Sequence, residues 1–347
     1  MVGRRGLLVA CCGIALALLP RPAAADDFYA GKIVNFIVGT EVSGGFAIYG
    51  RLIAKHLARF IPGNPTLVVK TMPGAGGATA ANYLYRMAPA DGLTIEALTP
   101  DSISGQVLGQ VADDGTPAKF DPTKFQYLAG AERGTRLCMT YATSKIKTFD
   151  DALTLPAIIG VTTSGSPATE YAAFHKHALG AKFNIVPGYR GPGDLYLAME
   201  RGEIDGVCGL DWAATKAQRP DWLRDKKLNL LIQDNIEPDA ELSALGVPQP
   251  WRYIKDDVDR RAVEVMVAFQ QAFGKAYVAP PAVPAERTKI LRAAFAAALR
   301  DEALLADAAT TRIEITPQSG EDVARAVAAL AAAPRPVVER LKQIVVP

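Results

Sequence analysis

Cysteine, histidine and net charge are all scarce in this chain of 347 residues. It contains only four cysteines and three histidines. No group of Cys, His and carboxylate residues has the spacing of a metal site. His175 and His177 are two positions apart on an expected helix, so they point to different faces and cannot share a metal. We therefore expect no metal.

Two of the cysteines, Cys11 and Cys12, lie in the N-terminal segment discussed next, which leaves Cys138 and Cys208. Each of these two stands in a strand-like context. An oxidising compartment permits a disulfide between them. Two cysteines flanked by apolar residues are also typical of an ordinary core. The sequence leaves both interpretations open.

The first 25 residues have the pattern of a secretory signal peptide. Met1–Arg5 is basic, Gly6–Leu19 is almost wholly apolar, and Pro20–Ala25 ends in three alanines. The apolar run is shorter than the roughly 20 residues that cross a membrane. No other uninterrupted apolar run in the chain reaches that length. We expect cleavage near Ala25 and export to the periplasm.

The remaining 322 residues have almost no net charge. The N-terminal segment carries three arginines and no acid, so 35 Lys and Arg face 36 Asp and Glu in the rest. Proteins that bind nucleic acid normally carry a basic surface, and we expect no nucleic-acid partner. At roughly 100–200 residues per domain, this length suggests about two domains.

Strand-like and helix-like segments alternate along the chain, which predicts an α/β fold with mostly parallel sheets. Phe125–Tyr141 is strand-like almost throughout and suits a long strand that crosses between two domains. The Ala-rich tail, Glu286–Val346, is expected to be helical in three pieces. In sheets of this kind, ligands bind at the carboxyl ends of the strands.

The stretch Leu67–Leu84 has the pattern of a strand, a glycine loop and a helix N-terminus. Gly74, Gly76 and Gly77 permit a sharp turn, and the unpaired N–H groups of a helix N-terminus attract anions. The loop comes near a dinucleotide fingerprint, but Thr79 stands at its last position and no acid is clearly placed to hold a ribose. We therefore expect no cofactor.

Five loops at expected strand ends carry glycine or hydroxyl residues. Backbone N–H groups and hydroxyls can hold a carboxylate without a buried counter-charge. Ordinary turns between strands and helices are also rich in Gly and Ser, but five such loops in an exported chain favour anion binding without catalysis. They are Ser43-Gly44-Gly45, Gly74–Gly77, Thr99–Ser102, Thr163–Ser166 and Tyr189-Arg190-Gly191.

A catalytic alternative has less support. No G-x-S-x-G nucleophile motif is present. An exported hydrolase could use Ser164 or Ser166 with Asp101 and a histidine, but all three histidines fall within expected helices. A purely structural interaction module is disfavoured because no large apolar or charged face is evident. We expect a protein that is not an enzyme.

The order of these motifs resembles the periplasmic solute receptors of tripartite tricarboxylate transporters, the Bug family. The resemblance runs through the whole mature chain, in IVNFIV–GTEVSGG–FAIYGRLIAKHL, VVKTMPGAGGATAANYLYRMAPADGLTI, VPGYRG, ERGEIDGVCGLD and APPAVP. It implies a fold like that of type II periplasmic binding proteins, with two α/β domains joined by two crossover strands and a cleft between them. One domain would hold residues 27–136 plus 275–347, and the other residues 137–274.

The resemblance also implies a function. The protein would be a monomer that closes over a small organic carboxylate and presents it to membrane transporter subunits. The ligand-binding residues would be Ser43, Gly44, Gly45, Phe46, Thr99, Asp101, Ser102, Thr163, Ser164, Gly165, Ser166, Tyr189, Arg190 and Asp211.

Two questions about this site stay open in the sequence. Arg190 could pair with a carboxylate or lie solvated on the rim of the cleft. Phe46-Ala47 stands where the family usually has Thr-Asp, and Glu41 lies in the same loop, so the identity of the ligand does not carry over. A less acidic or an aromatic ligand is compatible with these departures.

Overall fold

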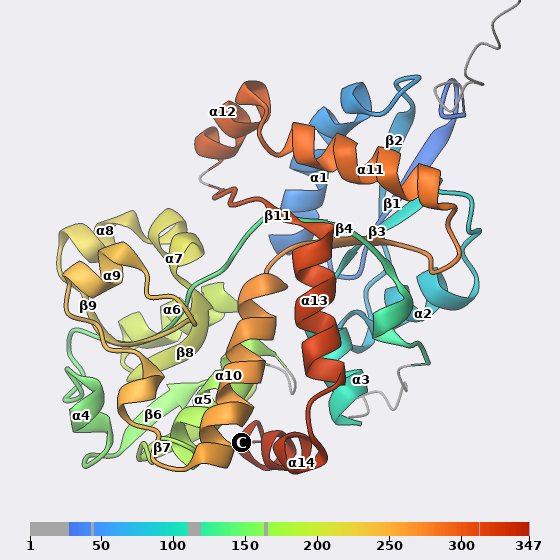
Figure 1. The fold of residues 1–347 in the computed structure, drawn as a ribbon. Helices are drawn as coiled ribbons and strands as arrows, with labels where there is room; N and C mark the ends of the chain where they lie inside the picture. The colour runs from blue at the N-terminus through green and yellow to red at the C-terminus, as the bar shows by residue number, and fades with distance from the viewer. Residues whose placement is uncertain (1–27, 43–44, 110–118, 163–165, 312, 347) are drawn as a thin grey trace, which may run out of the picture.

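The computed structural model describes residues 28–42, 45–109, 119–162, 166–311 and 313–346. Two β-sheets with helices packed on them form two lobes (Figure 1). We call the lobe around the six-stranded sheet the first lobe and the lobe around the five-stranded sheet the second lobe. Among the described residues, no helix is both long and apolar enough to cross a membrane.

The sheet of the first lobe has the strand order β11-β4-β10-β3-β1-β2. The strands β1, β2 and β3 are parallel, whereas β10 and β11 run antiparallel to their neighbours. The strands are β1 (Ile33–Val38), β2 (Thr66–Thr71), β3 (Thr94–Leu98), β4 (Gln126–Gly130), β10 (Ala276–Ala279) and β11 (Gln318–Ser319).

The sheet of the second lobe has the order β7-β6-β8-β5-β9. The strand β6 is parallel to β7 and β8, and β5 is antiparallel to β8 and β9. The strands are β5 (Arg136–Tyr141), β6 (Ala157–Gly160), β7 (Phe183–Val186), β8 (Gly206–Asp211) and β9 (Leu228–Asp234). Both sheets are mixed, but most strands of each run in one direction, as expected: only β10 and β11 oppose the others in the first sheet, and only β5 does so in the second.

β5 and β10 run antiparallel to their neighbours because each follows a connection between the two lobes. β4 lies in the first sheet and β5, the next strand, lies in the second, so the chain crosses between the lobes at residues 131–135. It returns after α10 (Asp257–Ala272) through a short connection into β10. A strand that enters a sheet from the other lobe is not bound by the parallel geometry of a local strand–helix–strand unit. The expected crossing within 125–141 is confirmed.

Helices cover both sheets. Those of the first half are α1 (Gly45–Leu57), α2 (Ala78–Arg86), α3 (Pro100–Leu108), α4 (Phe149–Ala152), α5 (Pro167–His177), α6 (Pro192–Arg201) and α7 (Trp212–Gln218). Those of the second half, after α8 (Pro220–Arg224), are α9 (Ala240–Ala244), α10, α11 (Ala285–Ala298), α12 (Glu302–Thr310), α13 (Gly320–Ala331) and α14 (Arg335–Ile344).

Two local expectations about helices were wrong. Thr99–Ser102 is not a loop, because Thr99 is the N-cap of α3 and Pro100 takes the first helical position, where its missing N–H costs nothing. The tail holds four helices in its described residues rather than three. Asp301 separates α11 from α12 because its side chain accepts a hydrogen bond from the N–H of Leu304 and so starts a new helix.

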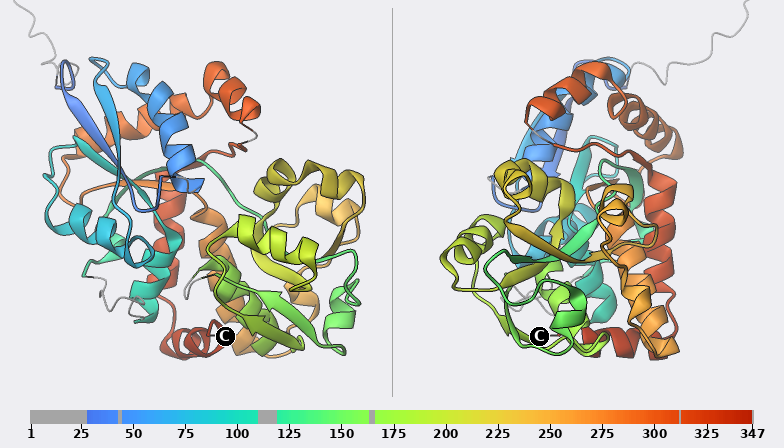
Figure 2. Two further views of the ribbon diagram at one scale, coloured as in Figure 1. Left: turned by 180° about the vertical axis from the view of Figure 1, so that it is seen from behind. Right: turned by 90° about the vertical axis from the view of Figure 1, so that its left-hand side faces the viewer.

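The helices α10 and α13 run side by side between the two lobes, and α14 lies across their ends (Figure 2). One apolar cluster joins the lobes there, because it includes Leu98 of β3, Cys138 of β5, Val267 of α10 and Val327 of α13. α14 packs against α5 as well as α3. The exact division at 27–136 plus 275–347 and 137–274 stays a prediction.

A disulfide joins Cys138 of β5 to Cys208 of β8. The sequence left open whether these cysteines form a disulfide, and in the structure they do. Both cysteines are fully buried, so they are core residues as well.

Candidate functional site

The described residues of the predicted site lie at the carboxyl ends of strands. Gly45 and Phe46 are the first two residues of α1 after β1, while Thr99 is the N-cap of α3 and Asp101 and Ser102 lie in its first turn after β3. In the second lobe the site residues follow β6, β7 and β8; they are Ser166, Tyr189, Arg190 and Asp211. Ser43, Gly44, Thr163, Ser164 and Gly165 lie outside the described residues.

The hydroxyl groups of this set are engaged within the protein. Thr99 Oγ1 donates to the carbonyl oxygen of Gly76 at 2.6 Å, and Ser102 Oγ donates to the carbonyl oxygen of Thr99 at 2.7 Å. Ser166 is the N-cap of α5, and its Oγ lies 2.6 Å from Thr162 Oγ1. These hydroxyls shape the ends of α3 and α5, and each retains lone pairs or a proton for further contacts.

The glycine loop Gly74–Gly77 packs against the N-terminus of α3. Gly77 has a φ of +97°, and a Cβ there would lie 2.2 Å from Thr99 Oγ1. Gly74 and Gly76 also have positive φ. Only glycine lets this loop pack so closely against the N-cap of α3.

Arg190 and Tyr189 have different surroundings. The side chain of Arg190 is 89% exposed and pairs with Asp194, with Nε 2.8 Å from Oδ2. A ligand contact by Arg190 therefore stays a prediction. Tyr189 is partly buried and packs over Gly160, where a Cβ would lie 3.1 Å from the Tyr189 ring.

Phe46 takes part in holding a buried cation. The ammonium of Lys275 lies 4.8 Å from the centre of the Phe46 ring and 5.0 Å from that of Tyr49. Its Nζ also pairs with Glu132 Oε2 at 2.6 Å. An aromatic ring at position 46 thus gives Lys275 a face to pack on.

Around Gly134 three charged groups converge. A Cβ at Gly134 would lie 2.9 Å from Asp211 Oδ2, 3.8 Å from Glu132 Oε1 and 3.9 Å from Arg136 Cζ. Gly134 stands in the crossing between β4 and β5, and Asp211 ends β8. The first crossing between the lobes therefore brings three charged side chains together around Gly134.

Arg136 is the cation of this group that lacks a partner. It is the first residue of β5 and is partly buried. Its Nε is buried without a hydrogen-bond partner, and no ion pair joins its guanidinium to a carboxylate of the described residues. The charge of Arg136 nevertheless acts on Asp101, Glu132 and Asp211. A partly buried guanidinium in this state is a strong candidate to bind an anion.

Asp211 uses its two carboxylate oxygens differently. Oδ1 accepts from the N–H of Ala214 at 2.7 Å and caps α7, while Oδ2 is buried beside the carboxyl group of Glu132, and a hydrogen bond joins the two acids when Asp211 carries a proton. Burial, followed by the nearby charge of Glu132, raises the pKa of Asp211 to about 7. Burial also acts to raise the pKa of Glu132, but the ammonium of Lys275 outweighs it and holds that pKa well below its usual range.

Asp101 reaches the same region from the first lobe. Its Oδ1 is buried without a partner, and burial raises the pKa of its carboxyl to about 7 against the opposing charge of Arg136. Beside it, Ser104 Oγ of α3 lies 3.3 Å from Glu170 Oε1 of α5, a contact between the two lobes. Gln270 of α10 donates to the other oxygen of Glu170 at 3.0 Å.

Sequence reasoning missed Arg136, Glu132, Lys275 and Glu170. None of them belongs to a glycine-rich or hydroxyl-rich loop. One available signal was the charged residue at the start of the strand expected to cross between domains, since Arg136 begins RLCMTY.

The histidines do not form a catalytic group with the described candidates. His56 pairs with Asp307 at 2.7 Å, and His175 is fully buried and bonds to Asp234 at 2.9 Å. The hydroxyl partners of Ser166 are Thr162 and Thr169, with no histidine among them. The described residues give the hydrolase alternative no support.

His175 does lie near both cysteines, contrary to the expectation from spacing. One ligand atom from each of Cys138, His175 and Cys208 falls within 4.8 Å of the others. The disulfide engages both sulfurs, so they are not thiolate ligands here.

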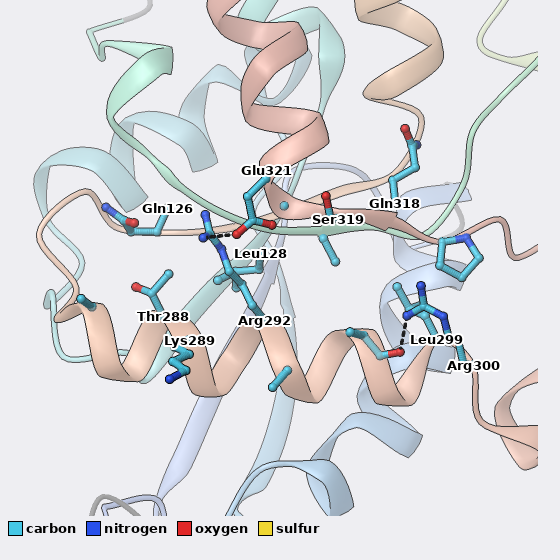
Figure 3. A pocket seen from close by; sticks show the side chains of 16 residues that line it. Gln126, Leu128, Thr288, Lys289, Arg292, Leu299, Arg300, Gln318, Ser319 and Glu321 are labelled. Carbon is cyan, nitrogen blue, oxygen red and sulfur yellow. Dashed lines mark hydrogen bonds and ion pairs between the residues drawn. The ribbon is translucent and has the colours of Figure 1, made fainter. Parts of the chain in front are cut away.

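A separate pocket of about 500 Å³ lies on the first lobe between α11, β4 and the start of α13 (Figure 3). Arg292 at its centre is already committed, because it donates to the carbonyl oxygen of Tyr127 and pairs with Glu321. This pocket contains none of the predicted site residues.

Comparison with solved structures identifies the fold. A TctC solute-binding protein from Polaromonas matches with a TM-score of 0.66 at 19% identity, over 90% of this chain and 99% of that chain. The periplasmic binding protein BugD matches with a TM-score of 0.61 at 15% identity, over 91% and 98%. MatC from Rhodopseudomonas palustris, with bound malate, matches with a TM-score of 0.61 at 17% identity, over 90% and 99%.

No family model matches the sequence. No curated protein sequence matches it either. The three structures are solute-binding receptors, and the likeness extends over nearly the whole of each. The chain thus has the fold of the periplasmic solute-binding proteins of the TctC and Bug group, as the sequence resemblance implied.

Proposed function

We propose that this protein is an exported, non-catalytic receptor that captures a small organic carboxylate between its two lobes. It would deliver that ligand to a tripartite tricarboxylate-type membrane transporter. A relative of the same fold is bound to malate, a dicarboxylate.

The observation that carries the proposal is the unpaired guanidinium of Arg136 between the lobes. A guanidinium presents its N–H groups in a planar fork that matches the two oxygens of a carboxylate. Arg136 has no such partner within the described protein. A carboxylate ligand would supply the missing partner at the place where ligands bind in two-lobed folds of this type.

Hinge closure between the lobes is part of the proposal. The chain crosses at 131–135 and again between α10 and β10, and short connections of this kind can absorb a rotation of one lobe against the other. The hydrogen bond between Ser104 of α3 and Glu170 of α5 joins the two lobes and would have to break if these helices separate. We place the domains at 27–136 plus 275–347 and 137–274.

Export, cleavage near Ala25 and action as a monomer complete the proposal. N-terminal sequencing of the protein recovered from a periplasmic extract tests the cleavage, with Asp26 expected as the first residue.

Binding is tested by a thermal-shift screen of carboxylates on protein freed of bound ligand by unfolding and refolding. A ligand at one hundred times its Kd should add about 2.7 kcal/mol of stability. Mass spectrometry of whatever co-purifies with the protein would identify the ligand directly. If no carboxylate stabilises the protein and only compounds without a carboxylate bind, the proposal is wrong.

A further inference from the structure

Cys138, His175 and Cys208 form a compact group of metal-binding side chains in the core of the second lobe. One ligand atom from each lies within 4.8 Å of the other two, and all three side chains are fully buried. Among the described residues, no further cysteine, histidine or carboxylate belongs to this group. Two sulfurs and one imidazole nitrogen are a donor set that zinc accepts in proteins.

Three different elements bring these side chains together. Cys138 lies in β5 and Cys208 lies in the neighbouring strand β8, and the register of the two strands shifts at Cys138. The helix α5 carries His175 and packs on β8. Because strand pairing and helix packing hold these elements, we expect the three side chains to stay close together when the disulfide is opened.

The ring of His175 is oriented as in a histidine that binds a metal. Its Nε2 lies 2.9 Å from Asp234 Oδ1, and Nε2 is the donor because a carboxylate only accepts hydrogen bonds. The other ring nitrogen, Nδ1, therefore carries a lone pair, and it is buried without a hydrogen-bond partner among the described residues. Histidines that bind zinc normally donate their second ring N–H to a carboxylate in this way. A metal ion would give Nδ1 the partner that it lacks.

The oxidation state of the cysteines decides whether the sulfurs can bind a metal. In the disulfide form the two sulfurs are bonded to each other. A dithiol reductant opens the bridge by thiol–disulfide exchange: the reductant becomes a disulfide, and Cys138 and Cys208 each gain one electron and one proton. One Zn²⁺ then replaces the two thiol protons, so the charge of the buried group does not change. Monovalent copper would add a net negative charge to the core, which is unfavourable.

We propose that the reduced chain binds one zinc ion through Cys138, Cys208 and Nδ1 of His175, with water in the fourth position. Around a tetrahedral zinc such ligand atoms lie roughly 3.5–3.8 Å apart, from bond lengths of about 2.3 Å to sulfur and about 2.0 Å to nitrogen. Atoms that already lie within 4.8 Å of one another need only small movements to reach this geometry.

The zinc ion would replace the disulfide as a link within the second lobe. The disulfide joins β5 to β8 in the oxidised chain. Zinc would join the same two strands and also α5 in the reduced chain. Because all three side chains are buried, the metal would enter as the reduced chain folds. This inference does not depend on the proposed receptor function.

The test compares the reduced and oxidised forms of the protein, made without a histidine tag. Each form is unfolded and refolded with zinc, the reduced form in a phosphine reductant, and loosely bound metal is removed by gel filtration. Elemental analysis should find one zinc ion per chain in the reduced form and almost none in the oxidised form. X-ray absorption at the zinc edge should show two sulfur neighbours at about 2.3 Å.

Variants distinguish this site from zinc bound at the surface. His175→Gln and Cys208→Ser should each weaken zinc binding by the reduced protein by tenfold or more. Asp234→Asn removes the carboxylate that orients the imidazole and should weaken binding by about tenfold. His177→Gln, at an exposed position of the same helix, is the matched control and should bind zinc like the wild type. Circular dichroism melts establish that each variant is folded.

The wild-type comparison decides the matter even if a variant does not fold. A reduced chain that takes up no zinc overturns the inference, as does equal zinc content in the reduced and oxidised forms. Zinc without sulfur neighbours, or zinc binding that is unchanged in His175→Gln, also overturns it. None of these results bears on the receptor function, because no carboxylate ligand takes part in the measurement.

Discussion

The buried pair of Lys275 and Glu132 allows a stability prediction whose size depends on pH. Lys275→Met keeps an unbranched chain against the rings of Phe46 and Tyr49 but removes the ammonium that lies 2.6 Å from Glu132 Oε2. The carboxylate of Glu132 is then left buried without its counter-charge. Such a loss typically costs about 3–5 kcal/mol.

The structure also sets an upper limit on that cost. Instead of staying charged, Glu132 can take up a proton, and from an ordinary pKa of 4.5 this costs about 3.4 kcal/mol at pH 7 but only about 0.7 kcal/mol at pH 5. Loss of the two ring contacts adds about 0.5–2 kcal/mol at either pH. We therefore expect losses of up to about 4–5 kcal/mol at pH 7 and up to about 1–3 kcal/mol at pH 5.

The sign follows from the pKa of Glu132. Lys275 holds that pKa below its ordinary value, so the stability from this carboxylate is present above the unfolded pKa and is lost only as the pH falls through the lower folded value. The wild type thus keeps the contribution at both pH 5 and pH 7. The variant lacks it, and its deficit grows as the pH rises above the ordinary pKa.

Urea unfolding followed by tryptophan fluorescence at pH 5 and pH 7 measures both losses. Lys289→Met, at an exposed position of α11, is the matched control and should change stability by less than about 0.5 kcal/mol. Adding Glu132→Gln to Lys275→Met should recover at least half of the loss at pH 7. A loss below about 1 kcal/mol at pH 7, or equal losses at the two pH values, would refute the reasoning.

Three further predictions concern the fold around the site. Burial and a neighbouring aspartate of α3 raise the pKa of Glu170 from 4.5 to about 8, so the wild type should lose stability as the pH rises from 4.5 to 8. Glu170→Gln should flatten the dependence of the melting temperature on pH, and parallel curves for the variant and the wild type would contradict this. Gly77→Ala should lower the free energy of unfolding in urea by more than about 3 kcal/mol, whereas Gly109→Ala should lower it by about 1 kcal/mol. Both glycines have positive φ, but only a Cβ at Gly77 would meet another atom within 4 Å. Equal losses would argue against close packing at Gly77. Replacing Cys138 and Cys208 together by alanine should lower stability by about 4 kcal/mol for a sequence separation of 70, and alkylation of the unreduced, unfolded protein should modify neither cysteine; modified cysteines would show that the bridge is absent.

Many helices and strands could be predicted from local sequence patterns. The strand at 33–38 and the helix that follows it were visible because apolar side chains recur at the spacing of each element. The short helix α4 was visible in its cap, since Thr148 and Asp151 form a capping box. The crossing at 125–141 was predicted from an almost continuous strand-like segment, although the structure divides that segment into β4 and β5.

What the sequence did not reveal depends on pairing between distant segments. The strand β10 is short, and nothing in AYVA says that it lies antiparallel between β3 and β4. The start of α3 was read as a loop because Thr99-Pro100-Asp101-Ser102 is polar, although a proline one residue after a threonine is also a helix start. The threonine–proline pair was the more specific signal of a helix start, but the interpretation followed the polar composition instead.

The site shows the same division between local and distant information. An aspartate at a strand end followed by a helix predicts a cap, and Oδ1 of Asp211 is that cap. Its other oxygen faces Glu132 and Arg136, which precede it by more than seventy positions and reach it only because β5 pairs with β8. Interpretation from loop composition pointed to Arg190 as one candidate and left its role open, and its side chain is exposed and paired with Asp194. The charge that lacks a partner is instead on Arg136 at the crossing, where a unit charge of opposite sign about 4 Å away would interact by about 4 kcal/mol at an effective dielectric constant of about 20. If the protein is the receptor proposed above, its specificity is expected to depend on residues that no single loop motif identifies.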